Sequence, residues 1–127
     1  MRLLIVCSML LLTTIAHAFT DAEVESALAD IVRTTNKTLP SGPEDGRVIS
    51  VNAGPGRRFN IYALSTRALA LWTPALIAES RRIAVDTYCR NPGMQGFRQL
   101  NVTVAWQLSD PRGRYVLTNA IAPTECR

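Results

Sequence analysis

The residues of this chain with the greatest chemical potential are two cysteines, Cys89 in the stretch VDTYCRNPG and Cys126 beside the C-terminus. A thiol can be a nucleophile, a metal ligand or one half of a disulfide, and its partners elsewhere in the chain decide which. The usual partners are scarce. The only histidine, His17, and the third cysteine, Cys7, both lie within residues 1–18.

Residues 1–18 have the pattern of a cleavable secretory signal peptide. A positive charge at Arg2 precedes an apolar run over residues 3–12, and the small residues of an Ala-His-Ala end follow. The run is about half as long as the roughly 20 apolar residues that span a membrane, so an uncleaved anchor is the less favoured alternative. We expect export, cleavage after Ala18, a single domain at residues 19–127 and no membrane span in the processed chain.

Cleavage would remove His17 and Cys7, and their loss excludes several kinds of site. Serine and cysteine hydrolases of the usual kind need an imidazole to transfer a proton. Zinc sites are built mainly from Cys and His, and the processed chain would hold only two such residues. We therefore expect no structural metal and no cofactor. Because two cysteines in an exported chain normally oxidise, Cys89 and Cys126 are predicted to form a disulfide.

Carboxylate chemistry is the enzymatic alternative that remains, because a glycosidase needs only two acids at a suitable separation. Nearly all acids of the processed chain fall on expected helix faces or in turns, where a solvated charge is the ordinary state. They are Asp21, Glu23, Glu25, Asp30, Glu44, Asp45, Glu79, Asp86, Asp110 and Glu125. We predict that the protein is not an enzyme, and a carboxylate-dependent hydrolase is the alternative.

Two helices should position many of these acids, and Cys89 with them. The first covers FTDAEVESALADIVRTTN, where Thr20 and Glu23 form a capping box. The second has Thr73 as its N-cap and Pro74 in its first turn, and it ends at the Asn-Pro-Gly that follows Arg90. Its apolar and small residues at helical spacing form an expected buried stripe of Leu76, Ile77, Ile83, Ala84, Thr87 and Tyr88.

Four strands complete the expected fold. RVISVNA and RRFNIYAL are joined by GPG as a hairpin, and NVTVAWQLS is joined to RYVLTNAIA through the turn DPRG. Alternation in NVTVAWQLS puts Val102, Val104, Trp106 and Leu108 on a core face, with Trp106 as an anchor, and leaves the other face to water. The stretch STRALALW fits either a strand or a helix. We expect a single small α+β domain in the order helix, strand, strand, helix, strand, strand, with a four-stranded sheet and the helices packed on one face.

The chain is basic, with 14 Lys and Arg against 10 acids, and all of these cations except Lys37 are Arg. Arg suits bidentate contacts with phosphate or carboxylate, although arginine-rich codon usage is a competing explanation. No aromatic residues are interleaved with the basic ones, so we expect no nucleic-acid partner.

Strand direction should divide the arginines between the two ends of the fold. If the second helix returns the chain to the start of the third strand, the two hairpin tips lie at opposite ends, and the disulfide closes beside the first tip. We therefore expect an anionic partner to contact this end through Arg57, Arg58 and Arg90, with Arg127 nearby. The arginines expected at the other tip, and outside that site, are Arg112 and Arg114.

From about Arg47 to the C-terminus, the segments FNIYAL, YCRNP, VTVAWQLSDPRGRYV and APTEC resemble a family of small secreted bacterial proteins described as quorum-sensing-regulated virulence factors. The resemblance implies an exported α+β domain with one disulfide, a role in virulence and no catalytic residues. We predict a non-enzymatic binding or accessory protein of the bacterial periplasm or extracellular space. Its partner is expected to be a macromolecule, either a protein or an anionic component of the envelope.

Overall fold

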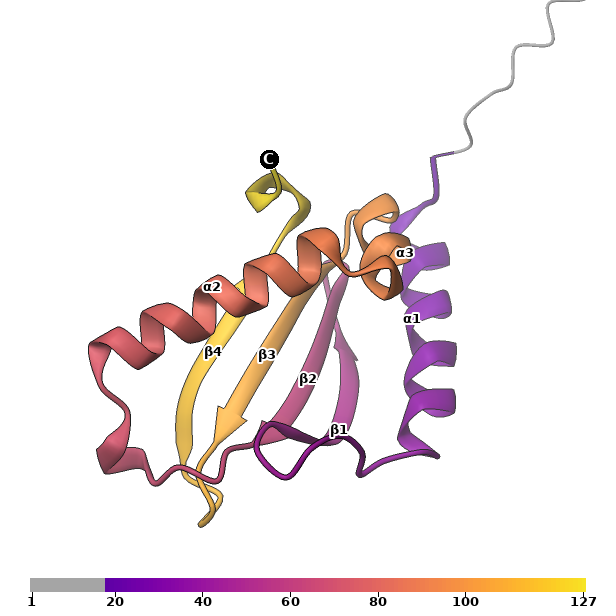
Figure 1. The fold of residues 1–127 in the computed structure, drawn as a ribbon. Helices are drawn as coiled ribbons and strands as arrows, with labels where there is room; N and C mark the ends of the chain where they lie inside the picture. The colour runs from indigo at the N-terminus through magenta and orange to yellow at the C-terminus, as the bar shows by residue number, and fades with distance from the viewer. Residues whose placement is uncertain (1–17) are drawn as a thin grey trace, which may run out of the picture.

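The computed structural model describes residues 18–127, in which helices cover a four-stranded sheet (Figure 1). The helices and strands are α1 (Asp21–Asn36), β1 (Arg47–Gly54), β2 (Arg58–Leu64), α2 (Pro74–Arg90), α3 (Gln95–Gln99), β3 (Thr103–Ser109) and β4 (Tyr115–Ile121). The predicted α+β class and order of elements are confirmed, and the short helix α3 is an addition between α2 and β3. The predicted signal peptide, up to His17, lies outside the described residues.

The sheet has the strand order β1-β2-β3-β4, so strands that follow one another in the sequence are also neighbours in space. The β1–β2 and β3–β4 pairs are antiparallel, whereas β2 and β3 run parallel, with Phe59 opposite Val104. A parallel pair needs a crossover that returns the chain along the sheet, and α2 provides it. Consequently the two hairpin turns lie at opposite ends of the sheet, as the sequence predicts.

Local signals account for the start of both long helices. The hydroxyl of Thr20 caps α1 by accepting a 3.2 Å hydrogen bond from the N–H of Glu23. Thr73 caps α2 in the same way and accepts from the N–H of Leu76 at 3.3 Å. Pro74 begins α2 without cost, because the first N–H groups of a helix have no intrahelical partner.

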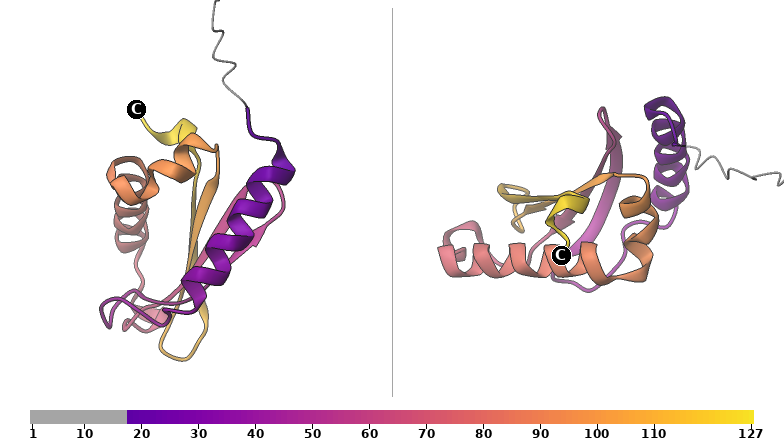
Figure 2. Two further views of the ribbon diagram at one scale, coloured as in Figure 1. Left: turned by 90° about the vertical axis from the view of Figure 1, so that its right-hand side faces the viewer. Right: turned by 90° about the horizontal axis from the view of Figure 1, so that it is seen from above.

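Both long helices pack on the same face of the sheet, α1 against β1 and α2 against β4 (Figure 2). Their buried side chains meet those of the strands in one core cluster of Val24, Leu28, Val51, Phe59, Ile61, Ala84, Tyr88, Val102, Val104 and Ile121. The expectation that the helices cover one face is therefore confirmed. The two helices nevertheless run in different directions over that face, since the sheet is twisted (Figure 1).

The expected buried stripe of α2 is too wide. Only Ala84 and Tyr88 are buried, whereas Ile77 is 40% exposed and Ile83 is 52% exposed. Both buried residues belong to the second half of the helix, so the first half packs less closely on the sheet.

The alternation predicted for β3 holds on the core face and fails in part on the other. Val102 and Val104 are fully buried, and Trp106 is half-buried against the core cluster. On the opposite face Ala105 is only 1% exposed, because β3 is a central strand whose small side chains are covered by residues of β2 and β4. That face is therefore not left to water along its whole length.

The stretch STRALALW is neither a strand nor an α-helix. It forms the loop between β2 and α2, with one short 3-10 helix at Leu69–Leu71. The N–H of Ser65 donates to the carbonyl of Ser109 at 2.8 Å and ties the start of the loop to the end of β3. The loop leaves Leu71 62% exposed beside the first turn of α2.

Candidate functional site

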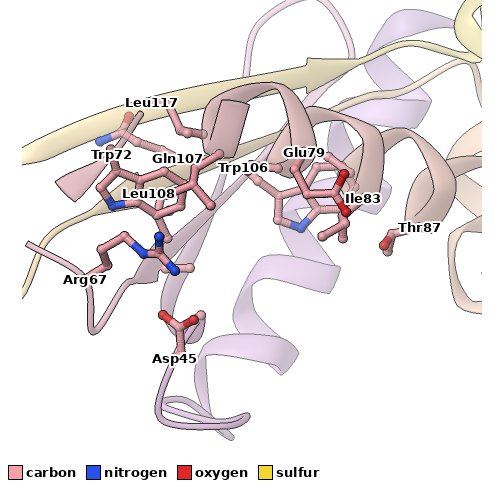
Figure 3. A pocket seen from close by; sticks show the side chains of 15 residues that line it. Asp45, Arg67, Trp72, Glu79, Ile83, Thr87, Trp106, Gln107, Leu108 and Leu117 are labelled. Carbon is pink, nitrogen blue, oxygen red and sulfur yellow. The ribbon is translucent and has the colours of Figure 1, made fainter. Parts of the chain in front are cut away.

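An apolar groove of about 440 Å³ lies between α2 and the sheet (Figure 3). It forms where the first half of α2 buries no residue against the sheet and where the small side chains of Ala63 and Ala84 leave space. The apolar side chains that line it come from α2 and three strands, and they are Ala63, Leu76, Ile83, Ala84, Trp106, Leu108 and Leu117. A concave apolar surface of this size is typical of a binding site.

Six residues that the sequence assigns to the core line this groove, and they are Leu76, Ile83, Ala84, Thr87, Trp106 and Leu108. Ile83 contributes an exposed side chain from α2, and Trp106 contributes part of its indole from β3. The polar contact of α2 with β4 lies nearby, where the side-chain amide of Asn119 donates to the hydroxyl of Ser80 at 3.0 Å. This hydrogen bond joins α2 to β4 at the side of the groove.

The spacing along α2 carries a signal for this groove, because Leu76, Ile83 and Thr87 belong to the stripe that the sequence predicts to be buried in the core. Leu76, Ser80, Ile83 and Thr87 lie at positions i, i+4, i+7 and i+11, and all four line the groove. They form a stripe beside the core stripe that contains Ala84 and Tyr88. Leu76 and Ile83 are the apolar members of this stripe, and they give α2 an apolar contact with the groove next to its contact with the core.

The loop between β2 and α2 forms one end of the groove. Trp72 lines this end, and the guanidinium carbon of Arg67 lies 5.5 Å from the centroid of its ring. Asp45, from the loop before β1, lies on the same side (Figure 3). The carboxylate of Asp45 accepts hydrogen bonds from the N–H of Thr66 at 2.9 Å and the hydroxyl of Ser65 at 3.3 Å, which ties the two loops together.

Asp110 binds the loop between β2 and α2 through Leu69, although its position in a turn predicts a solvated side chain. It is 0% exposed and accepts hydrogen bonds from the N–H groups of Leu69, Arg112 and Arg114 and from Nε of Arg114. Burial raises the pKa of Asp110, but the hydrogen bonds from Arg114, Arg112 and Leu69 outweigh it and leave that pKa below its ordinary value. The carboxylate is therefore a structural anion that fixes the loop beside the groove.

Two carboxylates near the groove, those of Glu79 and Asp110, have lowered pKa values. Glu79 lines the groove, but Arg82 donates to both of its oxygens, at 2.9 and 2.5 Å. These hydrogen bonds lower the pKa of Glu79, whereas a general acid needs a raised one. The pKa of Asp110 is also lowered, so neither group suits proton donation.

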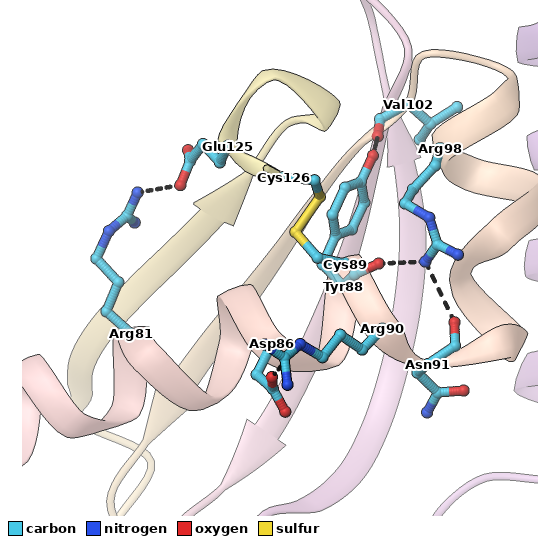
Figure 4. Close-up of a disulfide and its surroundings, with 10 residues drawn as sticks. All are labelled: Arg81, Asp86, Tyr88, Cys89, Arg90, Asn91, Arg98, Val102, Glu125 and Cys126. Carbon is cyan, nitrogen blue, oxygen red and sulfur yellow. Dashed lines mark hydrogen bonds and ion pairs between the residues drawn. A yellow bond between two sulfur atoms is a disulfide. The ribbon is translucent and has the colours of Figure 1, made fainter.

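The predicted disulfide joins Cys89 at the end of α2 to Cys126 near the C-terminus, with 5.3 Å between their Cα atoms (Figure 4). Both residues pack against the core cluster. Close by, the guanidinium of Arg98 donates to the carbonyl of Tyr88 and, at 3.2 Å, to that of Asn91. Cys89 is therefore one half of a disulfide at one end of the fold, and this end, with Cys89 and Cys126, is called the stapled end. Such a bridge is typical of proteins outside the reducing cytosol.

Arg57 lies at the stapled end, as expected, but its side chain is used within the fold. Its guanidinium donates to Asp21 at 2.6 Å, to the carbonyl of Leu100 at 2.8 Å and to that of Phe19 at 2.7 Å. Only 22% of the side chain is exposed. Arg57 therefore joins the start of the described chain to the segment before β3.

The other two candidate arginines lie near the same end but on different surfaces. Arg58 donates from Nε to Asn60 at 2.8 Å, and both residues project from the face of β2 opposite the helices. Arg90 projects from α2, where its Nε lies 3.1 Å from a carboxylate oxygen of Asp86. Arg90 and Arg127 line a second depression, beside the disulfide. The structure thus divides the three arginines instead of gathering them, and their contact with an anionic partner stays a prediction.

No protein-family model matches the chain, and no curated protein matches it. Solved structures share its fold. The pilotin EpsS of the Vibrio vulnificus type 2 secretion system superposes with a TM-score of 0.72 at 12% identity, over 84% of this chain and 94% of that one. A protein of Pseudomonas aeruginosa described as secreted gives 0.73 at 16% identity, over 84% and 96%. The type II secretion system pilotin AspS of Vibrio cholerae gives 0.66 at 15% identity, over 84% and 94%.

These likenesses establish the fold, which is shared by bacterial accessory proteins of a secretion system and by a protein described as secreted. Within residues 18–127, no helix is long and apolar enough to cross a membrane. The same residues contain no group of three or more Cys, His, Asp or Glu placed to hold a metal ion.

Proposed function

We propose that this chain is an exported, non-enzymatic accessory protein that binds an apolar segment of a partner protein in the groove between α2 and the sheet. The observation that carries the proposal is the groove itself, with Ile83 exposed at its edge and Trp106 in its wall. The shared fold of two type II secretion pilotins supports an accessory role in protein export. The lowered pKa of Glu79 argues against catalysis in the same groove.

The groove favours a helical partner segment. Its apolar lining comes mostly from side chains of α2 and of the face of β2, β3 and β4 that α2 covers. A bound segment would have to satisfy its own backbone N–H and C=O groups, because unpaired polar groups are costly on an apolar surface. A helix does this internally, and an amphipathic helix would present one apolar face to the groove.

Export and processing complete the proposal. Residues 1–18 act as a signal peptide, and residues 19–127 are the functional domain. The disulfide between Cys89 and Cys126 supports a destination outside the reducing cytosol, in the periplasm or beyond the cell. The quorum-sensing and virulence roles that the sequence resemblance implies stay separate predictions.

The α2 helix offers a matched pair of variants that tests the groove. Ile83 and Ile77 are both exposed isoleucines of α2, but only Ile83 lines the groove. A synthetic amphipathic helix with apolar residues at i, i+3, i+4 and i+7 serves as the probe, and its affinity is measured by fluorescence anisotropy with the oxidised protein.

Ile83→Asp should weaken probe binding at least about tenfold, since it places a charge where an apolar side chain must dock. Ile77→Asp should leave binding within about twofold, because it adds the same charge outside the groove. Equal losses in the two variants, or no binding of the probe by the unaltered protein, would contradict the proposed function.

A further inference from the structure

The end of the groove at the β2–α2 loop carries two side-chain donors, from Trp72 and Arg67, for which residues 18–127 supply no acceptor. The indole N–H of Trp72 is fully covered and has no hydrogen-bond partner among residues 18–127. The guanidinium of Arg67 lies over the ring of Trp72, and within the described chain no hydrogen bond or ion pair joins it to another side chain. A covered donor without an acceptor is uncommon and costly, so the Trp72 N–H calls for an acceptor, and the exposed cation of Arg67 beside it favours a negatively charged one.

The nearest acid on this side of the groove does not supply that group. The carboxylate of Asp45 is directed to the N–H of Thr66 and the hydroxyl of Ser65, and no ion pair joins it to Arg67. Glu79, which also lines the groove, is bound on both oxygens by Arg82. Arg67 therefore lines this groove as a cation that forms no ion pair with any of the described residues.

The loop that carries these donors is held in place from several sides. Ser65 bonds to Ser109, Thr66 to Asp45, and Leu69 to the buried Asp110. The rim is thus ordered before any partner arrives, which limits the entropy that binding costs. The Arg67 side chain itself is exposed, so it can adjust to a ligand.

We propose that this end of the groove binds a carboxylate of the partner helix, from an Asp or Glu placed at one end of its apolar stripe. Arg67 would donate to it through its guanidinium, whose planar fork matches a carboxylate, while the Trp72 ring supports the stacked cation. The indole N–H of Trp72 at the same end of the groove would be a second donor to this carboxylate. This inference rests on the proposed function and extends it, because the carboxylate would fix the direction in which the partner helix lies in the groove.

The test uses two versions of the amphipathic probe helix, both with blocked termini, one with Glu and one with Gln just beyond the apolar stripe. Each version is made with the Glu or Gln at either end of the stripe, so that the measurement also determines the direction in which the helix binds. Their affinities for the oxidised protein are measured at low salt. We expect the Glu version at one end to bind about five- to tenfold more tightly than its Gln counterpart, and the ratio to fall as salt is added.

Three variants assign this preference to its residues. Arg67→Gln should bring the Glu-to-Gln ratio to about one without changing the affinity of the Gln probe. Trp72→Phe keeps the ring but removes the N–H, and should lower the ratio part of the way. Arg33→Gln, which removes an exposed charge that pairs with Asp30 on α1, is the control and should leave the ratio unchanged.

The outcomes separate this inference from the proposed function. Binding of both probes without a preference, or a preference that survives Arg67→Gln, overturns the carboxylate site and leaves the groove function standing. Failure of both probes to bind contradicts the groove function and this inference with it.

Discussion

The phenolic hydroxyl of Tyr88 donates a 2.7 Å hydrogen bond to the backbone carbonyl of Val102, and both residues are 0% exposed (Figure 4). The bond links the last turn of α2 to the residue before β3, across the short helix α3. Burial raises the pKa of Tyr88, so the hydroxyl keeps its proton and remains a donor at any ordinary pH. The packing of α2 against the sheet therefore depends on a buried polar contact beside the disulfide.

Tyr88→Phe should destabilise the protein by about 1 to 3 kcal/mol, because it leaves the Val102 carbonyl buried without its partner. The free energy of unfolding is measured by urea denaturation of the oxidised protein. Tyr115→Phe is the control and should change stability little, since Tyr115 is 57% exposed and its hydroxyl, which donates to Thr118, is open to water. A Tyr88→Phe variant as stable as the unaltered protein would show that the carbonyl finds another donor.

Removing the disulfide should also lower stability. Cys89 and Cys126 are 37 positions apart, and closing a loop of this length restricts the unfolded chain by about 3 to 4 kcal/mol. The double variant Cys89→Ala with Cys126→Ala should show that loss in urea denaturation. Addition of reductant should destabilise the unaltered protein and leave the double variant unchanged. If the double variant were as stable as the oxidised protein, the staple would have no structural role.

Acid should loosen the loop at the end of the groove through Asp110. Because the folded-state pKa of Asp110 is lowered, its carboxylate stabilises the fold above the ordinary value of 3.8, and this contribution disappears as the pH falls below that value. Asp110→Asn should lower the melting temperature at pH 7 by several degrees and lessen the further drop in acid. Melting temperatures of both proteins across this range check the sign. An unchanged acid dependence in the variant would assign it to other carboxylates.

Processing can be read from intact mass. The exported protein should begin at Phe19, and its mass should be lower by two hydrogens than that of the reduced chain, as one disulfide requires. Thiol alkylation without reductant should add no label. A species that retains Met1, or one that takes up label under native conditions, contradicts the prediction.

The anion site at the stapled end remains to be tested, and the structure improves the choice of variants. Arg57 and Arg114 are poor choices, since Arg57 clips three segments together and Arg114 pairs with the buried Asp110. Arg58→Glu and Arg90→Glu should weaken binding to vesicles that contain an anionic phospholipid, and should reduce its dependence on salt. The control is Arg112→Glu at the opposite tip. Equal effects at both ends would refute a localised site.

The features that could be predicted from the sequence are those that depend on local geometry and on covalent chemistry. Helix starts at Thr20 and Thr73 are visible because a capping hydroxyl acts within three residues of its own position. The alternation of Val102 and Val104 gave the core face of β3, since side chains of a strand point to opposite sides in turn. The disulfide followed from the number of cysteines left in an exported chain.

Tertiary structure alone decided which apolar residues face the core and which face the groove. Ile77 and Ala84 lie seven positions apart on one face of α2, yet Ile77 is 40% exposed and Ala84 is 8% exposed, because the distance between α2 and the sheet depends on packing along the whole helix. The same holds for charge. Arg57 is bound by Phe19, Asp21 and Leu100, which are 38, 36 and 43 positions away, so its role as a clip exists only once distant segments meet. Contacts of that range leave no periodicity in the chain, and only the folded structure brings them together.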